Sequence, residues 1–571
     1  MRILGISGHY HDAAAALIED GVPVAMAEEE RFTRIKHDSS FPRNAINFVL
    51  ERSGSRDLDY VVFYEKPFLK FERFAVSSLS FFPRSCKVFV EGMLSYIKEK
   101  MWVKSLIKDA LDIDGDKILF VPHHLSHSAG SFFCSPFEES AILSVDGVGE
   151  WTTTAIGTGE ENRINLFKEV RFPHSLGLLY SAFTGYLGFK VNEGEYKLMG
   201  MSPYGEPVYE DKIRKLIDIK DDGSYRLNLD YLAFHAPNDK PYNDKFVELF
   251  GDPRDPKMEH RFEKRHADIA ASIQKVTEDA LIKLANSAYE ASGSKNLCIA
   301  GGVALNSVAN FKILNSTRFE KIFIQPAAGD AGGALGAALF IYYSILGNKR
   351  SYTMEHSYYG SDHDSSYIRE FLESGGIDYE EYGSGEIPRL IAEEIDGGKV
   401  VGLYQGRSEW GPRALGNRSI LADARSRDML KNVNLKIKFR ESFRPFAPSV
   451  MYEDAEDLFE IPRDDYPSRF MLYVCPVRLD VRDKDMLPAV THIDGSARPQ
   501  VVIPDLSTRY HQTLERFKEL TGVGCFLNTS FNLSGEPIVN TPENAYSSFS
   551  KSMMDTLVLE NFVVSKDGRN I

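Results

Sequence analysis

The chain has 571 residues, more than one hydrophobic core usually supports, so at least two domains are expected. A composition of 43% hydrophobic and 26% charged residues excludes wholesale disorder and fibrous repeats, and the net charge of −15 argues against coating nucleic acid. The first residues lack the apolar stretch of a signal peptide, and no run of about 18 apolar residues follows. A cytoplasmic location without membrane association is therefore expected.

The five cysteines are scattered and form no C-x-x-C pair. This pattern argues against a disulfide framework and against a thiolate zinc site. We expect reduced cysteines that mostly serve in packing.

Two strand–turn–strand patterns predict a duplicated α/β domain. Residues 3–7 and 14–18 flank the turn 8–12, and residues 141–145 and 152–156 flank the turn 146–150. The repeat suggests that the two turns face one cleft, as they do in actin-like ATPase domains.

A long amphipathic helix is predicted from His266 to Ser292, ending at Gly293. After it, residues 297–300 indicate a short buried strand that enters the Gly301-Gly302 turn, with a helix beginning near Ala304. Such a turn lets the backbone approach a nucleotide closely.

The polar, aperiodic segment 346–364 marks the expected domain boundary, which divides the chain into residues 1–350 and 351–571. Residues 399–404 predict a strand at the start of a mixed α/β second domain.

His123 and His127 are four residues apart, so on a helix opening after Pro122 both imidazoles would share one face. Asp146 and Asp330 are the best candidates for oxygen ligands, and this ligand set favours iron, manganese or zinc. A histidine pair with this spacing is also common without a metal, and Asp330 would equally serve as a helix N-cap. His124 lies off the shared face and is expected to support the site or lie at the surface.

His11, beside Asp12 in the first turn, would suit a general base, although a turn histidine is more often structural.

Residues 407–444 contain ten Lys and Arg and four Asp and Glu, which gives a net charge of +6 in an acidic chain. Arg413 and Arg444, set among glycines, prolines and rings, look like fixed clamps for a phosphorylated ligand. For Lys431 and Arg440 a solvated helix face is the preferred interpretation.

The polar residues 528–532 follow an apolar strand at 523–527. Their short side chains could hydrogen-bond a nucleotide, and a plain turn explains them equally well.

The chain resembles the O-carbamoyltransferases of antibiotic and nodulation-factor biosynthesis nearly from end to end. The motifs that carry the resemblance are His11-Asp-Ala13, Glu28-Glu-Glu-Arg-Phe-Thr33, His123-His-Leu-Ser-His127, Asp146-Gly147, Lys197-Leu-Met-Gly200, Gly301-Gly-Val303, Gly411-Pro-Arg-Ala-Leu-Gly416, Arg444-Pro-Phe-Ala-Pro448, Ser496-Ala-Arg-Pro-Gln500 and Leu527-Asn-Thr-Ser-Phe-Asn532.

This resemblance implies an α/β fold with a duplicated actin-like domain over residues 1–350 and a YrdC-like mixed α/β domain over residues 351–571. It implies that carbamoyl phosphate and ATP, with Mg²⁺, yield carbamoyl-adenylate in the second domain. The carbamoyl group would then pass to a hydroxyl of a small molecule in the first domain.

The resemblance also assigns residues to roles. His11 would act as catalytic base, and Lys36 would contact the acceptor. Fe(II), or Mn or Zn in its place, would bind His123, His127, Asp146 and Asp330. Carbamoyl phosphate would bind Arg413, Lys438 and Arg444. The adenosine part of the intermediate would bind Gly301, Gly302 and Asn306, and ATP would bind Arg498, Asn528, Ser530 and Asn532.

One position departs from the family pattern. The member that acts on the aminoglycoside tobramycin has an acidic residue two positions before the histidine, and this chain has His9 there. A cationic aminoglycoside is therefore in doubt as acceptor. A threonylcarbamoyl transferase for tRNA and an actin-like ATPase switch remain alternatives, and the sequence leaves both monomer and homodimer open.

Overall fold

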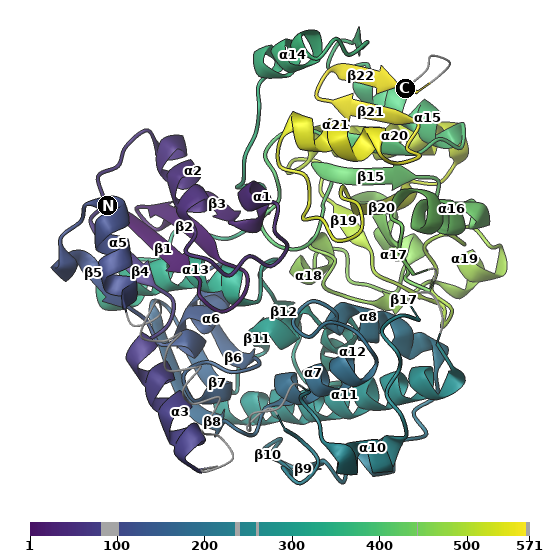
Figure 1. The fold of residues 1–571 in the computed structure, drawn as a ribbon. Coiled ribbons are helices and arrows are strands. Elements are labelled where there is room, and N and C mark those ends of the chain that lie inside the picture. The colour runs from purple at the N-terminus through teal and green to yellow at the C-terminus, as the bar shows by residue number, and fades with distance from the viewer. Residues whose placement is uncertain (81–101, 234–239, 259–261, 442, 567–571) are drawn as a thin grey trace. The chain divides into compact units, whose positions relative to one another are not determined.

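The computed structural model describes residues 1–80, 102–233, 240–258, 262–441 and 443–566, and its chain divides into two compact units (Figure 1). The first unit comprises Met1–Glu29 and His37–Met354, and the second comprises Glu30–Lys36 and Glu355–Ile571. The division after Met354 lies close to the boundary expected at residue 350. That the segment Glu30–Lys36 groups with the second unit was not indicated by the sequence.

Two five-stranded sheets form the centre of the first unit. The first has the order β3-β2-β1-β4-β5, and the second has the order β8-β7-β6-β11-β12. In each sheet three strands pair antiparallel in succession and two further strands add in parallel. The strands are β1 (Arg2–Ser7), β2 (Ala14–Glu19), β3 (Val22–Glu28), β4 (Tyr60–Phe63), β5 (Ile118–Phe120), β6 (Glu139–Val145), β7 (Thr152–Glu160), β8 (Arg163–Arg171), β11 (Asn296–Ala300) and β12 (Lys321–Phe323). The identical order confirms the predicted duplication and both predicted hairpins.

Two helices cover the sheets next to the hairpin turns. Helix α13 (Asp330–Leu339) packs on β1 and β2, and also on α6 (His123–Phe132). The small residues of α13 allow this close approach, because a Cβ on Gly336 would lie 1.8 Å from the carbonyl oxygen of Ser126. Figure 1 shows α6 and α13 as the helices that meet between the two sheets.

The predicted long helix is confirmed as α11 (Lys264–Ser292), which ends at Gly293 in the left-handed conformation. The remaining helices of the unit surround the sheets. They are α2 (Arg43–Ser53), α3 (Pro67–Ser80), α5 (Val103–Leu111), α7 (Leu176–Tyr186), α8 (Glu195–Met201), α9 (Glu210–Ile213), α10 (Asp244–Phe250) and α12 (Ser307–Ser316), with the small hairpin β9 (Ile217–Ile219) and β10 (Tyr225–Leu227).

The second unit is built on one mixed sheet of eight strands in the order β13-β22-β21-β14-β15-β20-β16-β19. These are β13 (Glu380–Glu381), β14 (Val401–Tyr404), β15 (Arg418–Ala422), β16 (Ala447–Met451), β19 (Gln500–Val502), β20 (Cys525–Ser530), β21 (Thr556–Leu559) and β22 (Phe562–Ser565). Helices α15 (Ile387–Asp396) and α20 (Thr508–Thr521) bury Ile391 and Phe517 against one face of it. The strand predicted at 399–404 is β14.

The other elements of this unit are short. They are α14 (Ser365–Ser374), α16 (Arg427–Asn432), α17 (Ala455–Leu458), α18 (Tyr466–Arg469), α19 (Leu479–Asp483) and α21 (Pro542–Ser550), with the hairpin β17 (Cys475–Pro476) and β18 (Ser496–Ala497). The excursion Glu30–Lys36, which contains α1 (Glu30–Thr33), joins the unit through two arginines. Arg31 donates to the carbonyl of Gly411 at 2.7 Å, and Arg34 donates to the carbonyls of Pro537 and Ile538.

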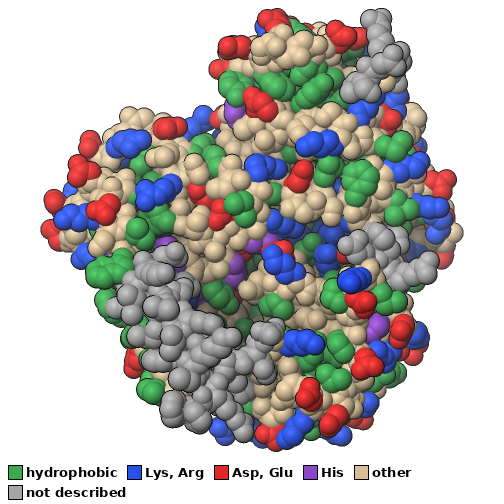
Figure 2. All heavy atoms as spheres, viewed as in Figure 1, with side chains coloured by type: hydrophobic (Ala, Val, Ile, Leu, Met, Phe, Trp, Pro, Cys, Tyr) green, Lys and Arg blue, Asp and Glu red, His purple; other side chains and the backbone are tan. Residues whose placement is uncertain are grey.

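In the described part of the chain no helix is both long and apolar enough to cross a membrane. Basic and acidic side chains are interspersed over the face shown in Figure 2. Cys134, Cys298, Cys475 and Cys525 are free and buried, as expected for packing thiols, and Cys86 lies outside the described residues.

Candidate functional site

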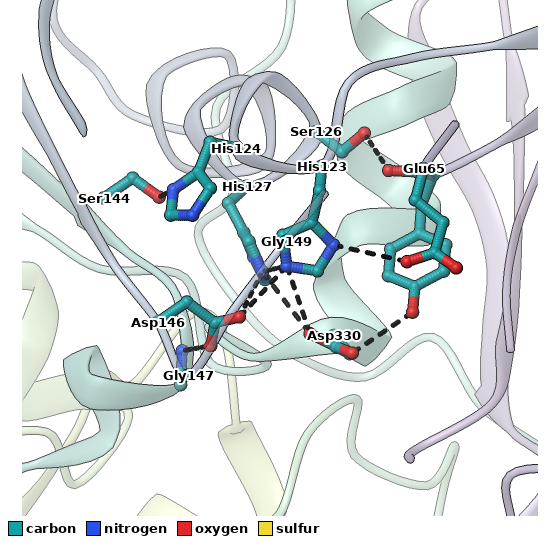
Figure 3. A network of polar contacts seen from close by, with 12 residues as sticks. Glu65, His123, His124, Ser126, His127, Ser144, Asp146, Gly147, Gly149 and Asp330 are labelled. Carbon is teal, nitrogen blue, oxygen red and sulfur yellow. Dashed lines mark hydrogen bonds and ion pairs between the residues drawn. The ribbon is translucent and has the colours of Figure 1, made fainter. Parts of the chain in front are cut away.

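A buried cluster of two histidines and two aspartates lies in the first unit (Figure 3). Helix α6 opens directly after Pro122, as predicted, and its first two turns carry His123 and His127. Asp146 follows the last residue of β6, and Asp330 is the first residue of α13. The hairpin turn and the two helix starts thus bring the four residues together, although up to 207 positions separate them in sequence.

The ligand atoms of this cluster face one another at close range. The Nε2 atoms of His123 and His127 are 3.0 Å apart, and Nε2 of His123 lies 3.0 Å from Asp146 Oδ2. Asp330 Oδ1 lies 3.7 Å from Nε2 of His123 and 3.4 Å from Nε2 of His127. Tetrahedral ligands at about 2.0–2.1 Å from a metal are about 3.3 Å from one another, so these spacings suit such an ion.

The charges of the cluster also fit a divalent ion. Burial alone would lower the pKa of His123, but the carboxylates of Asp330 and Asp146 outweigh it and raise the pKa to about 9. Burial would raise the pKa of Asp146, yet His123 and His127 hold it well below its usual range. The positive charge of His123 therefore offsets part of the negative charge of the two carboxylates, and a divalent cation bound by the four residues would take over this role.

Residues around the cluster fix its members. The hydroxyl of Tyr64 donates to Asp330 Oδ2 at 3.2 Å, and the backbone N–H of Gly302 donates to Asp146 Oδ1 at 2.9 Å. Both oxygens of Glu150 accept from the backbone N–H of His123, at 3.1 and 3.2 Å. Sequence reasoning missed Tyr64 and Glu150, because neither carries a motif and only the fold brings them here.

The structure corrects one sequence interpretation at this site and decides between the two alternatives for His124. Asp330 is not an N-cap, because Gly329 occupies that position and the Asp330 side chain makes no capping hydrogen bond. His124 does not lie at the surface: it is 4% exposed, and its ring nitrogens contact Ser144 Oγ at 2.8 Å and the carbonyl of Thr152 at 2.9 Å. His124 therefore ties α6 to β6 and β7.

His11 lies beside the cluster and is oriented by Asp12. Its Nδ1 is 2.9 Å from Asp12 Oδ2, and its Nε2 is 3.9 Å from Asp330 Oδ2. The other oxygen of Asp12 is 2.7 Å from Nδ1 of His37, a contact that the sequence did not indicate. The negative charges around His11 outweigh its burial and raise its pKa to about 10. Because Asp12 takes Nδ1, the Nε2 atom is the one presented to the cluster.

The Gly301-Gly302 turn supports the cluster directly. Gly301 has a φ of 89°, and a Cβ there would lie 2.2 Å from the carbonyl oxygen of Val145, next to Asp146. Asn306, whose contact with the nucleotide stays a prediction, is the N-cap of α12, and its amide exchanges hydrogen bonds with Gln274 at 3.0 and 3.1 Å. The helix predicted near Ala304 begins as a 3₁₀ turn, and α12 starts at Ser307.

Replacing Gly301 with alanine should destabilise the first unit by about 1–3 kcal/mol, because the new methyl group meets backbone at a strained φ. Gly293→Ala is the matched control, since Gly293 also has a positive φ of 69° but has no atom within 4 Å of its Cβ position. Chemical denaturation of both variants measures the difference. Equal losses would show that the contact with Val145 is unimportant.

A cluster of cations lies in the second unit. Burial lowers the pKa of the Arg498 guanidinium well below its usual range, and the like charges of Arg413 and Arg444 lower it further. The Nε atom of Arg498 is buried without a hydrogen-bond partner among the described residues. Burial and the charges of Arg440, Arg444 and Lys36 likewise lower the pKa of Lys438. The mutual repulsion of these cations favours the binding of an anionic ligand among them.

Asn528 is a buried residue of β20 in the second unit. Its Nδ2 donates to Ser449 Oγ and Gln500 Oε1, both at 3.0 Å, while its Oδ1 is buried without a hydrogen-bond partner in the described structure. The interpretation of residues 528–530 as a plain turn is wrong, because they continue β20 and pair with β15. Ser530 and Asn532 meet through a hydrogen bond of 2.7 Å.

Lys438 holds the segment 530–532 through hydrogen bonds from its buried side chain. It is 3% exposed, and its ammonium donates to the carbonyls of Ser530 and Asn532 and to Asn532 Oδ1 at 2.7, 2.8 and 2.6 Å. An ammonium group has three donors, so these contacts use all of them. Lys438 therefore shapes the loop, and its contact with carbamoyl phosphate stays a prediction.

Lys438→Met should destabilise the second unit by about 1–3 kcal/mol, since it leaves buried oxygens unpaired. Lys436→Met serves as control, because Lys436 is exposed and only two residues away. Urea denaturation measures both. A Lys438 variant as stable as the control would contradict the structural role of this ammonium.

Glu409 holds the 411–416 loop, and the sequence did not single it out. Its Oε1 accepts from the backbone N–H groups of Leu415, Asn417 and Arg418.

Lys431 is exposed as expected, but the solvated interpretation of Arg440 is wrong. Arg440 lies 4.5 Å over the ring of Phe446 and donates to Asn434 Oδ1 at 2.7 Å.

Lys36 belongs to the excursion that joins the second unit, where its charge acts on Lys438. Lys36 thus lies with the cations of the second unit, and its contact with the acceptor stays a prediction. His9 lies in the first hairpin turn, with its ring 6.4 Å from Phe41 and 6.5 Å from Phe63.

Comparison with known proteins covers both units. Residues 2–339 match the family model of the carbamoyltransferase N-terminus, and residues 392–566 match that of the carbamoyltransferase C-terminus. A protein of Synechocystis sp., Uncharacterized protein sll1178, is 49% identical over 99% of this chain and 97% of its own length. Nodulation protein NolNO of Sinorhizobium fredii is 37% identical over 97% of this chain and 79% of its own length.

Nodulation protein U of Rhizobium tropici is 29% identical over 94% of this chain and 91% of its own length. The ROK hexokinase from Thermus thermophilus, a solved structure, covers 61% of this chain and 100% of its own at 13% identity, with a TM-score of 0.31, too low to support an inference. The two family models together account for most of both units. The chain therefore belongs to the carbamoyltransferase family and is a carbamoyl-transferring enzyme.

Proposed function

We propose that this enzyme is an ATP-dependent O-carbamoyltransferase with two reaction centres. In the second unit, water would hydrolyse carbamoyl phosphate to carbamate and inorganic phosphate, and the carbamate would attack the α-phosphate of ATP to give carbamoyl-adenylate and pyrophosphate. In the first unit, a hydroxyl of a small molecule, such as a sugar or another natural product, would take the carbamoyl group and release AMP. The folds expected for these roles are an actin-like first unit and a YrdC-like second unit.

The observation that carries this proposal is the position of His11 beside the cluster of His123, His127, Asp146 and Asp330. Asp12 holds the Nδ1 side of His11. A divalent ion bound by the cluster would offset the carboxylate charges that raise the pKa of His11, and would leave Nε2 free to take the proton from the acceptor hydroxyl. A divalent ion held by the four residues, Fe(II) or Mn or Zn, would stabilise negative charge on the phosphate of the intermediate as a Lewis acid. Gly301 and Gly302 would bring the backbone close to the adenosine part.

The cation cluster of the second unit supports the activating half. Arg413 and Arg444 would bind the phosphate of carbamoyl phosphate, and Arg498 the phosphates of Mg-ATP, since guanidinium groups bind phosphate oxygens in pairs. Asn528 has a buried carbonyl oxygen available for the nucleotide. Ser530 and Asn532, set by Lys438, complete the proposed ATP contacts.

Isotope tracing tests the proposal. Purified enzyme, ATP and carbamoyl phosphate labelled at the carbamoyl carbon are incubated with a panel of sugars and hydroxylated natural products. Mass spectrometry should find the label in carbamoyl-adenylate and in one carbamate ester, with AMP formed in equal amount. Specific binding of tRNA in a separate assay, or ATP hydrolysis that does not depend on carbamoyl phosphate, would instead support the alternatives.

A further inference from the structure

A buried ion pair lies next to the histidine–aspartate cluster. Lys70 Nζ is 2.6 Å from Glu65 Oε2, and each side chain is only 5% exposed. Burying two charges costs free energy that a pair of this kind often fails to recover. Glu65 and Lys70 belong neither to the four ligands nor to the proposed base, so stability alone is a weak reason for their presence.

The neighbouring ring of His123 explains why a carboxylate is present at this position. Its Nε2 faces Asp146 and His127, while its Nδ1 is buried without a hydrogen-bond partner among the described residues. Oε2 of Glu65 lies 3.9 Å from this Nδ1, and Figure 3 shows the carboxylate on the side of the ring opposite Asp146. A histidine that binds a metal through Nε2 carries its proton on Nδ1, and this N–H is almost always given to a carboxylate, a carbonyl or water.

We propose that Glu65, held by Lys70, is a positioning residue that accepts the Nδ1–H of His123 and thereby fixes this ring as a metal ligand. The inference rests on the metal centre of the proposed function. A shift of about 1 Å would bring the two atoms within hydrogen-bond distance. The ion pair with Lys70 holds the carboxylate of Glu65 beside the ring, where it can accept a charge-assisted bond.

The backbone around Glu65 is tied to the same site. The neighbouring Tyr64 donates to Asp330, and its carbonyl accepts from Ser126 Oγ at 2.8 Å, which anchors it to α6. On the other side, Glu150 accepts from the backbone N–H groups of both Lys66 and His123. Glu65 therefore lies between two residues whose contacts hold it against the start of α6.

Metal affinity tests this role without any measurement of activity. The full-length chain, stripped of metal, is titrated with Co²⁺ against a chromophoric chelator, and the ligand-field bands of bound Co²⁺ report its coordination. Glu65→Gln should bind Co²⁺ about 10–100-fold more weakly than the wild type. Lys70→Met keeps the carboxylate and should lose much less. A purely structural role of the ion pair predicts equal losses in the two variants.

Glu278→Gln is the matched control, since Glu278 is 2% exposed and pairs with Lys312 at 2.6 Å in the same unit, and it is not one of the four ligands. Circular dichroism checks the folding of each variant, and Glu65→Asp, which keeps the charge but shortens the side chain, supplies a second variant if Glu65→Gln does not fold. Wild-type affinity in Glu65→Gln, or in Glu65→Asp used in its place, would overturn this inference alone. A wild-type chain that binds no Co²⁺ would overturn the metal centre, and the inference with it.

Discussion

Asp330→Asn should abolish carbamoyl transfer while leaving the formation of carbamoyl-adenylate intact. The substitution keeps the shape of the side chain but removes one of the two carboxylate charges that would balance a divalent ion. Loss of residues that merely support ligands costs 10–100-fold in metal affinity, so loss of a ligand itself should cost more than about 100-fold. We expect transfer to an acceptor to fall at least as far.

Two assays separate the halves of the reaction for this variant. Pyrophosphate release from ATP and carbamoyl phosphate reports activation, and AMP release with a carbamate ester reports transfer. Glu278→Gln, which changes the buried carboxylate paired with Lys312, should retain both. If Asp330→Asn transfers the carbamoyl group at the wild-type rate, the buried cluster is not the transfer centre.

Arg498→Leu should have the opposite effect and stop activation. The guanidinium is buried, and the like charges of Arg413 and Arg444 hold its pKa below the usual range, so its contribution to binding is realised only when an anion is bound. Truncating one partner of a buried, charge-assisted contact costs about 2–5 kcal/mol, which corresponds to roughly 30- to several-thousand-fold in kcat/KM for ATP. The metal affinity of the first unit should remain unchanged.

Arg427→Leu is the control for this variant. Arg427 pairs with Asp485 on the surface, where its side chain is 73% exposed, and it lies in the same basic stretch of sequence. Its removal should leave pyrophosphate release unaffected. Equal losses in Arg427→Leu and Arg498→Leu would mean that the overall charge of the unit matters, and that Arg498 has no specific role.

Local patterns were sufficient to predict much of the fold. The hairpin around residues 8–12, the helix that ends at Gly293 and the helix that opens after Pro122 all follow from alternation, period and end signals. The four residues of the buried cluster could be chosen because two of them share a helix face and two follow strand or glycine turns. Their convergence itself depends on the duplicated sheet order.

Other features depend on contacts that spacing does not encode. Spacing does not reveal that the Asn306 amide exchanges hydrogen bonds with Gln274 on α11. Asp12 contacts both His11 and His37, because the chain returns to the first hairpin turn at His37. The excursion Glu30–Lys36 joins the second unit through carbonyls some 380 and 500 positions away, which no local signal predicts.

One measurement tests the central claim most directly. Purified enzyme is mixed with ATP and carbamoyl phosphate in the absence of acceptor, and pyrophosphate and carbamoyl-adenylate are quantified for the wild type and for Arg444→Ala, with each substrate omitted in turn. The account predicts that both products form in equal amounts in the wild type, that both require carbamoyl phosphate, and that both are lost in the variant. Absence of both products from the folded, metal-supplied wild type, or pyrophosphate release without carbamoyl phosphate, would contradict it.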